Sequence, residues 1–438
     1  MTDLEGTGIV TQTRSCGCPS EEAPRGLSRR TFLRAAAATG ALAGLGAPML
    51  STRLAYAANG ASYTGDVLVV VSLRGGFDGL SAVVPAGETA YYSARPDVAV
   101  PASLLLARDQ MFGLHPALSP LLPYWQAGTF GAVHAVGQAD PTRSHFEALE
   151  EMERAAPGTS LRSGWLDRML GVRGAGTTFQ AAQVGSTMAA LSLSGPAPEL
   201  AMRDVDGFAL SGGNGEVNAR LTAALRAAYA SAPPAQAAPA ISALGALATT
   251  AKLAASKYVP ANGAAYPDTP LAKAMRDVAR LVKAGVGLQV ACVDYGDWDF
   301  HENLGAPRAG GLLNDHLTVL AGALAAFATD LGTVMSGVTV ATLSEFGRRL
   351  AQNGTGGTDH GHGNAVLLLG GGVLGGRVHG RWPGLGAAQL DQGDLRGLTD
   401  YRTVLGEVLQ KRCGAGSLAT VFPGFTMPSP LGIVRSRT

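Results

Sequence analysis

Seven consecutive residues, Val67–Leu73, read Val-Leu-Val-Val-Val-Ser-Leu. An apolar run without polar alternation is typical of a strand in a parallel sheet, buried on both faces. Similar short runs recur at 131–136, 287–293, 338–343 and 365–369. Helical patterns lie between the runs, at 118–125, 144–154 and 317–334. The alternation predicts an α/β fold, with a mainly parallel sheet flanked by helices.

The middle of the chain has a different composition. Two Ala-rich helical segments, 218–230 and 240–258, are separated by Ser231-Ala232-Pro233-Pro234. We therefore predict a helical insertion over about 160–285, within one domain that spans 58–438.

The N-terminus has the pattern of an export signal. Arg29 and Arg30 precede a weakly apolar Ala/Gly/Leu stretch, and Ala55-Tyr56-Ala57 matches a small-x-small cleavage site. The paired arginines resemble the twin-arginine export signal. A membrane anchor would need a more apolar run of about 20 residues. We predict a signal peptide at 1–57, the twin-arginine translocase as a partner during export, and a mature protein in the periplasm, envelope or extracellular space without a stable membrane span.

Overall charge excludes some functions. The 438 residues include 34 Lys and Arg against 33 Asp and Glu, a formal net charge of +1. Nucleic-acid binding through phosphate neutralisation needs a basic surplus that this chain lacks. Two of the four cysteines, Cys16 and Cys18, lie in the predicted signal, so the mature chain can form one disulfide at most.

Acidic and histidine residues follow the predicted strands, in a chain with only 15% charged residues. The positions after these strands are Arg74, Asp78, Arg143, Ser144, His145, Asp297, His301, Glu345, Asp359, His360 and His362. In open α/β sheets, ligands bind beyond the carboxyl ends of the strands. Asp and His without Cys are ligands for Zn²⁺, Mn²⁺ or Mg²⁺, and converging carboxylates repel each other unless a cation neutralises them.

Each element taken alone also has a structural interpretation. Asp78 between glycines is an ordinary turn residue, and Asp359-His360 is an ordinary loop or cap. The pair Asp297 and His301 could form a polar loop edge. His115, His134 and His316 have structural contexts, and the role of His379 stays open.

The motifs together resemble a known family. Those that carry the resemblance are 73–80 (LRGGFDGL), 143–146 (RSHF), 344–348 (SEFGR) and 357–361 (GTDHG). They are similar to the twin-arginine-exported family called domain of unknown function 1501 (DUF1501). That family resembles a branch of the alkaline phosphatase-like superfamily, which includes sulfatases and cofactor-independent phosphoglycerate mutases. The resemblance implies an alkaline phosphatase-like core.

The resemblance also implies a ligand set for two divalent cations. Asp78 matches the superfamily's first Asp, Asp297 and His301 match its Asp-x-x-x-His pair, and Asp359-His360 matches its Asp-His dipeptide. The last histidine ligand would be His362 or His379. Glu345, directly at a strand end, would be a ligand or a base beside one.

The implied reaction is in-line transfer at phosphorus or sulfur. Ser144, at the start of a predicted helix, would be the nucleophile. Arg143 or Arg74 would hold the non-bridging oxygens, although Arg143 could equally pair with Asp140 or Glu147.

Three functions are therefore open. We expect an exported metal-dependent hydrolase of phosphate or sulfate esters. The alternative is a non-enzymatic envelope protein for binding or assembly on the same fold. A Ser–His–Asp hydrolase is disfavoured, because Ser144 lacks the Gly-x-Ser-x-Gly pattern.

Overall fold

A nine-stranded sheet forms the centre of the computed structural model. Its strands are β1 (Val67–Leu73), β4 (Phe130–Gly137), β5 (Ala181–Val184), β6 (Leu200–Met202), β7 (Val290–Tyr295), β8 (Val338–Leu343), β11 (Asn364–Gly370), β12 (Val378–His379) and β13 (Thr399–Asp400). Their order is β12-β4-β11-β8-β1-β7-β5-β6, with β13 beside β4. Every pair is parallel except the two that β11 makes, with β4 and β8.

The structure describes residues 65–173, 176–210 and 215–437. The predicted signal peptide at 1–57 lies outside these residues. The predicted α/β class is confirmed. The strands predicted at 67–73 and 338–343 coincide with β1 and β8, and the other three shift by one to three residues at their ends.

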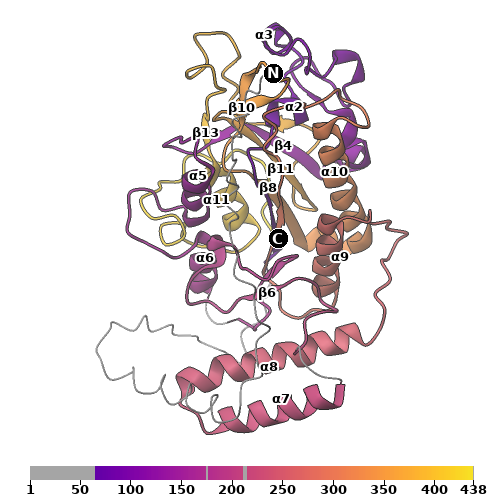
Figure 1. The fold of residues 1–438 in the computed structure, drawn as a ribbon. Helices are drawn as coiled ribbons and strands as arrows, with labels where there is room; N and C mark the ends of the chain where they lie inside the picture. Colours follow the sequence, from indigo (N-terminus) through magenta and orange to yellow (C-terminus); the bar gives the residue numbers. More distant parts are fainter. Residues whose placement is uncertain (1–64, 174–175, 211–214, 438) are drawn as a thin grey trace, which may run out of the picture. The chain divides into compact units, whose positions relative to one another are not determined.

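Helices cover both faces of the sheet (Figure 1). One face packs against α9 (Pro270–Lys283) and α10 (Leu312–Leu331), and the other packs against α5 (His145–Arg154), α6 (Trp165–Arg173) and α11 (Tyr401–Lys411). Within β1, Val69 and Val71 point into the first core, while Leu68 and Val70 point into the second. Since successive side chains alternate across a strand, a strand buried on both faces must be apolar throughout.

The remaining elements are short. They are α2 (Gly79–Ala82), α3 (Thr89–Ala94), α4 (Leu122–Gln126), and the two-stranded pairs β2 (Val83–Val84) with β3 (Gly113–Leu114) and β9 (Arg348–Gln352) with β10 (Thr358–His360). The helix predicted at 118–125 is a 3₁₀ segment, Pro116–Leu121, followed by α4. Pro120 lies inside this 3₁₀ segment, and a proline there has no N–H to continue an α-helical ladder.

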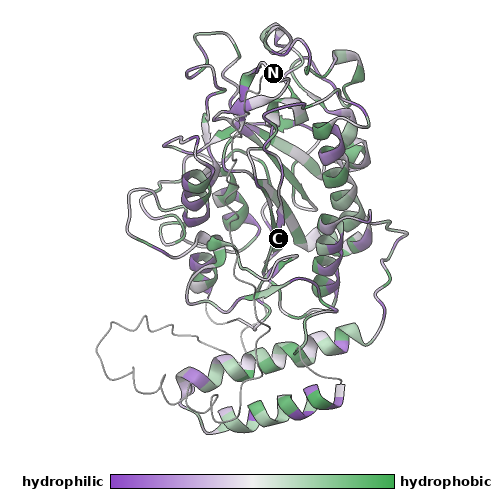
Figure 2. Cartoon of the chain, in the orientation of Figure 1, coloured by the Kyte–Doolittle hydropathy of each residue, from purple (hydrophilic) through white to green (hydrophobic). Residues whose placement is uncertain are grey.

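The region predicted as a helical insertion, 160–285, is helical only in part. Strands β5 and β6 of this region extend the main sheet beside β7. Their four and three residues are too short to show a strand period in the sequence. The helical part separate from the sheet is a pair, α7 (Gly215–Ala230) and α8 (Pro234–Ala254), which is largely hydrophobic in Figure 2.

Two described helices are long and apolar enough to cross a membrane by length and composition. The segment Leu312–Gly337 is 56% buried and contains α10, whose apolar residues pack in the first core. Burial of this kind is typical of a core helix. The segment Gln236–Ala254 in α8 is 17% buried.

Strand direction places the loops that carry the polar motifs. The carboxyl ends of β1, β4, β7 and β8 lie at one edge of the sheet, because these strands run the same way. Strand β11 runs the opposite way, so its amino end lies at that edge as well. The segment that precedes β11 includes β10, with Asp359 and His360, and therefore joins the loops that follow the parallel strands.

Replacing Leu317 by Ala tests whether α10 is a core helix. Leu317 is fully buried, and its truncation should lower the free energy of unfolding by about 2–5 kcal/mol. Leu312→Ala on the same helix is the matched control, since Leu312 is 44% exposed and should change stability by only about 0.5 kcal/mol. Urea unfolding of both variants measures the difference, and equal losses would contradict the packing.

Candidate metal centre

Three histidine rings from separate segments meet at the carboxyl edge. His145 begins α5, His301 lies in the loop after β7, and His360 ends β10. His360 Nε2 lies 3.0 Å from His145 Nε2 and 2.9 Å from His301 Nε2. His145 and His301, from two separate segments, therefore both bring their Nε2 atom to His360 Nε2.

The other nitrogen of each ring faces an oxygen. His145 Nδ1 lies 2.7 Å from Glu345 Oε1, His301 Nδ1 lies 3.1 Å from Asp359 Oδ1, and His360 Nδ1 lies 2.8 Å from the Arg143 carbonyl oxygen. A carboxylate or carbonyl oxygen only accepts, so each Nδ1 carries the hydrogen. In the neutral imidazole, each Nε2 then holds a bare lone pair. Three lone pairs facing one another are unfavourable unless a cation lies between them.

A carboxylate completes the group. Asp299 Oδ1 lies 3.1 Å from both His301 Nε2 and His360 Nε2, and Asp299 Oδ2 lies 3.3 Å from His145 Nε2. Arg348 donates to Asp299 Oδ1 at 2.6 Å. Burial alone would raise the pKa of Asp299, but the hydrogen bond and charge of Arg348 outweigh it and lower the pKa to about 2. Asp299 is therefore a carboxylate near neutral pH.

The donor set fits a zinc-like cation. Ligands about 2.0–2.1 Å from a tetrahedral ion lie about 3.3 Å from one another, close to the 2.9–3.3 Å separations that involve His360 or Asp299. His145, Asp299 and His360 offer ligand atoms that all lie within 4.8 Å of each other, and they form the one such group among the described residues; His301 adjoins this group through His360 and Asp299 but is not a member of it. Three imidazoles and a carboxylate are borderline ligands, which suit Zn²⁺ better than Mg²⁺.

Local sequence explains how the ligands are placed. Ser144 is the N-cap of α5 and accepts from the Glu147 N–H, so the helix begins at His145. Gly357 lies against the backbone of His301, where a Cβ would approach within 2.1 Å of the His301 carbonyl carbon. Only glycine allows this approach, which sets the β9–β10 hairpin and His360 beside His301.

Several of the predicted residues lie at this centre. Some bring a ring nitrogen to it, and others hold a histidine ring in place. His301 and His360 contribute Nε2 atoms to it. Glu345 and Asp359 instead hold the Nδ1 atoms of His145 and His301, so their carboxylates orient ligands. In the same way, Arg143 acts through its backbone carbonyl.

Asp78 lies in a different environment from the one predicted. It caps α2, and its two carboxylate oxygens accept from Arg95 at 2.6 and 3.2 Å. Both side chains are at least 98% buried. No hydrogen bond or ion pair joins Asp78 to the three histidines within the described part of the chain. The Arg95 guanidinium neutralises the Asp78 carboxylate. The sequence pattern did not indicate this pairing.

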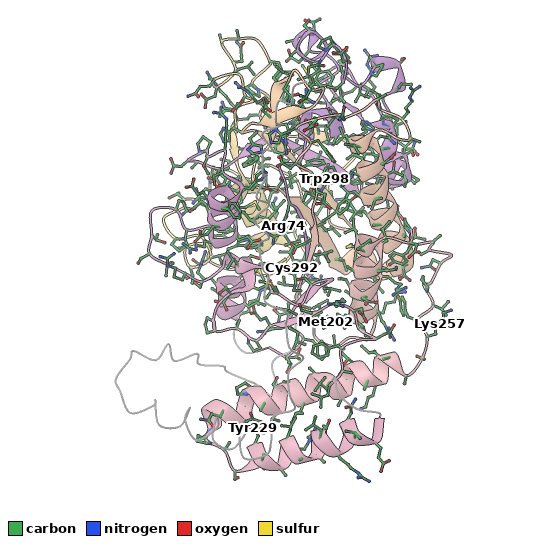
Figure 3. All side chains as sticks on the ribbon, in the orientation of Figure 1. Arg74, Met202, Tyr229, Lys257, Cys292 and Trp298 are labelled. Atoms are coloured by element: carbon green, nitrogen blue, oxygen red, sulfur yellow. The ribbon has the colours of Figure 1, made fainter. Side chains whose placement is uncertain are left out.

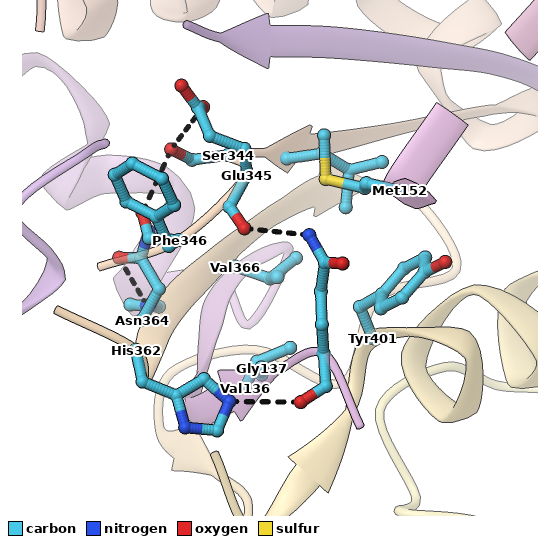
Figure 4. A pocket seen from close by; sticks show the side chains of 13 residues that line it. Val136, Gly137, Met152, Ser344, Glu345, Phe346, His362, Asn364, Val366 and Tyr401 are labelled. Carbon is cyan, nitrogen blue, oxygen red and sulfur yellow. Dashed lines mark hydrogen bonds between the residues drawn. The ribbon is translucent and has the colours of Figure 1, made fainter. Parts of the chain in front are cut away.

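The structure likewise separates Asp297 from the centre, because Asp297 is exposed and has a left-handed backbone with φ of 65°. Asp tolerates such turns, and Asp299 supplies the carboxylate instead. His362 Nε2 binds the Gln138 carbonyl oxygen at 2.9 Å, in the direction away from the Glu345 carboxylate (Figure 4). His379 Nε2 binds the Leu374 carbonyl oxygen at 2.7 Å, outside the cluster.

Both candidate arginine clamps are paired with acids. Arg74, which directly follows β1 and is labelled in Figure 3, donates to Asp294 and to Glu153, each at 2.9 Å. The Arg143 guanidinium contacts Asp394 at 2.5 Å, in place of the alternative partners Asp140 and Glu147.

Three side chains of this candidate centre were not selected as site residues from the sequence. His145 stands in the RSHF motif beside the residue chosen as nucleophile, and Asp299 lies inside the Asp-Trp-Asp-Phe-His segment, where the spacing favoured Asp297. Both could have been found as the remaining Asp and His of motifs already selected. Arg348 was harder to select from the sequence, because a single arginine in the SEFGR motif does not indicate that its side chain is buried.

The family model for DUF1501, described as a protein of unknown function, matches residues 66–396. This chain belongs to the DUF1501 family. No curated protein matches this DUF1501 chain.

Solved structures give distant likenesses to this DUF1501 protein. One is the C-terminal periplasmic domain of EcEptC from Escherichia coli in complex with Zn, at 7% identity and a TM-score of 0.32, covering 71% of this chain and 75% of that one. Another is the PsFucS1 sulfatase from Pseudoalteromonas sp., at 12% identity and a TM-score of 0.34, covering 85% and 74%. Because both TM-scores are below 0.5, these two likenesses carry no argument about the fold. The fold described above is that of this chain's own strands and helices.

Arg348→Lys should disrupt the centre. A lysine has one ammonium in place of the planar guanidinium, so it cannot replace bonds to the carbonyls of Gly76, Trp298 and Thr358 together with Asp299. We expect a loss of about 3–5 kcal/mol in unfolding free energy and a lower zinc content. Arg349→Lys is the matched control because Arg349 is 40% exposed. Similar behaviour of the two variants would contradict this role of Arg348.

Proposed function

We propose that this DUF1501 protein is an exported metal-dependent hydrolase of phosphate or sulfate esters. The observation that supports it is the convergence of three Nε2 atoms and one carboxylate at the carboxyl edge of the sheet. Ligand and active sites of open α/β folds gather at this edge. The distant likenesses to a sulfatase and to a zinc-bound domain are compatible with the proposal but add no weight to it.

His145, His360 and Asp299 would hold the cation, and His301, whose Nε2 lies 2.9 Å from His360 Nε2, would be a further ligand; Glu345 and Asp359 would orient two of the imidazoles. The cation would supply Lewis-acid stabilisation of charge on an ester oxygen. Ser144 is the proposed nucleophile. It adjoins His145 at the amino end of a ten-residue helix, where backbone N–H groups favour an anionic ester.

We propose one cation at this centre. Two were expected from the resemblance, with Asp78 as a ligand of one of them. The Asp78 carboxylate is instead bound on both oxygens by Arg95, and the described residues contain a single His/Asp group of metal-binding spacing.

The export prediction is part of the proposal. The twin-arginine-like segment Ser28–Arg34 indicates passage through the twin-arginine translocase and residence in the periplasm, envelope or extracellular space. That pathway resembles a route for already folded proteins, which suits a protein that binds its cation before export.

The second candidate function is a non-enzymatic envelope protein for binding or assembly. The observation that favours it is the pairing of both Arg74 and Arg143 with carboxylates, which offsets part of the positive charge that each guanidinium could offer to an anionic ester. Turnover measurements distinguish the two candidates.

Elemental analysis tests the cation. The full chain purified without chelator should contain about one zinc per chain, and His360→Ala should lose it because His360 Nε2 faces all the other ligands. His379→Ala is the control, since His379 lies outside the cluster and should leave the metal content unchanged. A metal-free wild type, or a loss in His379→Ala instead, would contradict the proposed centre.

Ester hydrolysis tests the reaction. Zinc-loaded protein should cleave members of a panel of aryl phosphates and sulfates, and Ser144→Ala should lower turnover at least about 100-fold with zinc content retained. The Ser144 side chain also caps α5, so Ser144→Ala should cost about 1 kcal/mol of stability, measured in parallel.

Thr142→Ala controls for local loosening, because the Thr142 hydroxyl accepts from the Ser144 N–H but is not the proposed nucleophile. Full turnover in Ser144→Ala would exclude Ser144 as nucleophile. A zinc-loaded protein inert to the whole panel would favour the binding protein.

A further inference from the structure

The acceptor behind His360 lies in an exposed loop. His360 Nδ1 faces the backbone carbonyl oxygen of Arg143, whereas the Nδ1 atoms of His145 and His301 face carboxylates. Arg143 belongs to the loop between β4 and α5, and residues 139–141 and Arg143 itself are exposed. A surface loop with few buried groups does not by itself fix the position of a carbonyl. A contact from outside the loop has to hold this one.

The side chain of Arg143 makes that contact. Its guanidinium donates to Asp394 Oδ2 at 2.5 Å, across 251 positions of the chain. The Thr142 hydroxyl, in contrast, donates to Glu147 at the start of the adjoining helix. Among the described residues, the bond to Asp394 is the one side-chain hydrogen bond or ion pair that joins residues 139–143 to a distant segment.

Asp394 has a fixed position of its own. Its side chain is 3% exposed, and it lies in a turn closed by two backbone hydrogen bonds of 2.9 Å with Asp391. The next residue, Leu395, is fully buried, and its carbonyl oxygen accepts from the Gly363 N–H at 2.7 Å. Arg349 Nε lies 3.3 Å from Asp394 Oδ1, a contact of charge that a lysine at position 349 would keep. Two positive charges thus offset the cost of burying this carboxylate.

We propose that Asp394 is a positioning residue of the metal centre, which acts through Arg143 on His360. The Asp394 carboxylate holds the Arg143 guanidinium, and the Arg143 carbonyl oxygen holds His360 Nδ1. Because His360 Nε2 lies beside the Nε2 atoms of both His145 and His301, the orientation of its ring affects the whole centre. This role of Asp394 depends on the proposed metal centre but not on ester hydrolysis.

Zinc affinity of the full chain, measured by competition with a coloured chelator, tests this role. Arg143→Ala keeps the backbone carbonyl but removes its anchor, and Asp394→Ala removes the other half of the pair. Each variant should bind zinc about tenfold more weakly, at the low end of the effect of groups that orient metal ligands. The double variant should bind zinc like either single variant, because both changes break the same link.

Asp391→Ala is the matched control. Asp391 is exposed in the same turn, and within the described part of the chain its side chain makes no ion pair, so its removal should leave zinc affinity unchanged. Asp394→Asn keeps the shape of the side chain and removes its charge, and it replaces Asp394→Ala if that variant does not fold.

Cobalt-loaded protein gives a readout that a loss of stability alone would not change. The visible absorption spectrum of bound Co²⁺ depends on the arrangement of its ligands. The spectrum should therefore differ from that of the wild type in Arg143→Ala and Asp394→Ala, and should be unchanged in Asp391→Ala. Urea unfolding of the same samples measures stability separately.

Four outcomes would overturn this role of Asp394. Equal zinc affinity in the wild type, Arg143→Ala and Asp394→Ala would do so while leaving the metal centre intact. Additive losses in the double variant would mean that the two residues act independently. Lower ester turnover in Arg143→Ala at unchanged zinc affinity would place the guanidinium on the substrate. A wild type that binds no zinc would overturn the metal centre and this role together.

Discussion

The guanidinium of Arg348 joins the three loops on which the metal centre depends. It donates to the carbonyl oxygens of Gly75 and Gly76 after β1, to Trp298 and Asp299 after β7, and to Thr358 in β10. The side chain is 1% exposed, so none of these bonds competes with bulk water. A planar donor fork can satisfy acceptors in several directions at once, which an ammonium cannot. The position of Asp299 follows from this one residue.

The histidine rings are oriented by hydrogen bonds at their Nδ1 atoms and not by Arg348. Each Nδ1 is fixed by an oxygen, two of them carboxylates, so the Nε2 atoms of His145 and His301 are both presented to His360 Nε2. Such acceptors behind metal-binding imidazoles set the tautomer and strengthen the ligand. In the proposed centre, Glu345 and Asp359 would therefore act on the cation through the imidazole rings that they hold. An acidic cluster with nothing bound would instead lose stability through repulsion.

Much of the fold and part of the site could be predicted from the sequence. Val67–Leu73 identifies a doubly buried strand because burial on both faces leaves no polar positions. His301 and His360 could be selected because they follow predicted strands. Asp78 and Asp297 could not be separated from Asp299 in this way, since a motif does not reveal that Arg95 binds Asp78 or that Asp297 adopts a left-handed turn. Strands β5 and β6 are too short to show a period.

The amino-acid sequence alone determined the α/β class, the main strands and the acids and histidines that follow strand ends, because hydrophobic period and the order of residues along the chain are local properties. Only the tertiary structure decided which of those side chains meet, that His145 and Asp299 join His301 and His360, and that Arg95 binds Asp78. Hydrogen bonds and ion pairs between residues tens to hundreds of positions apart make that choice. Their partners are set by the packing of the whole chain and leave no mark at either position in the sequence.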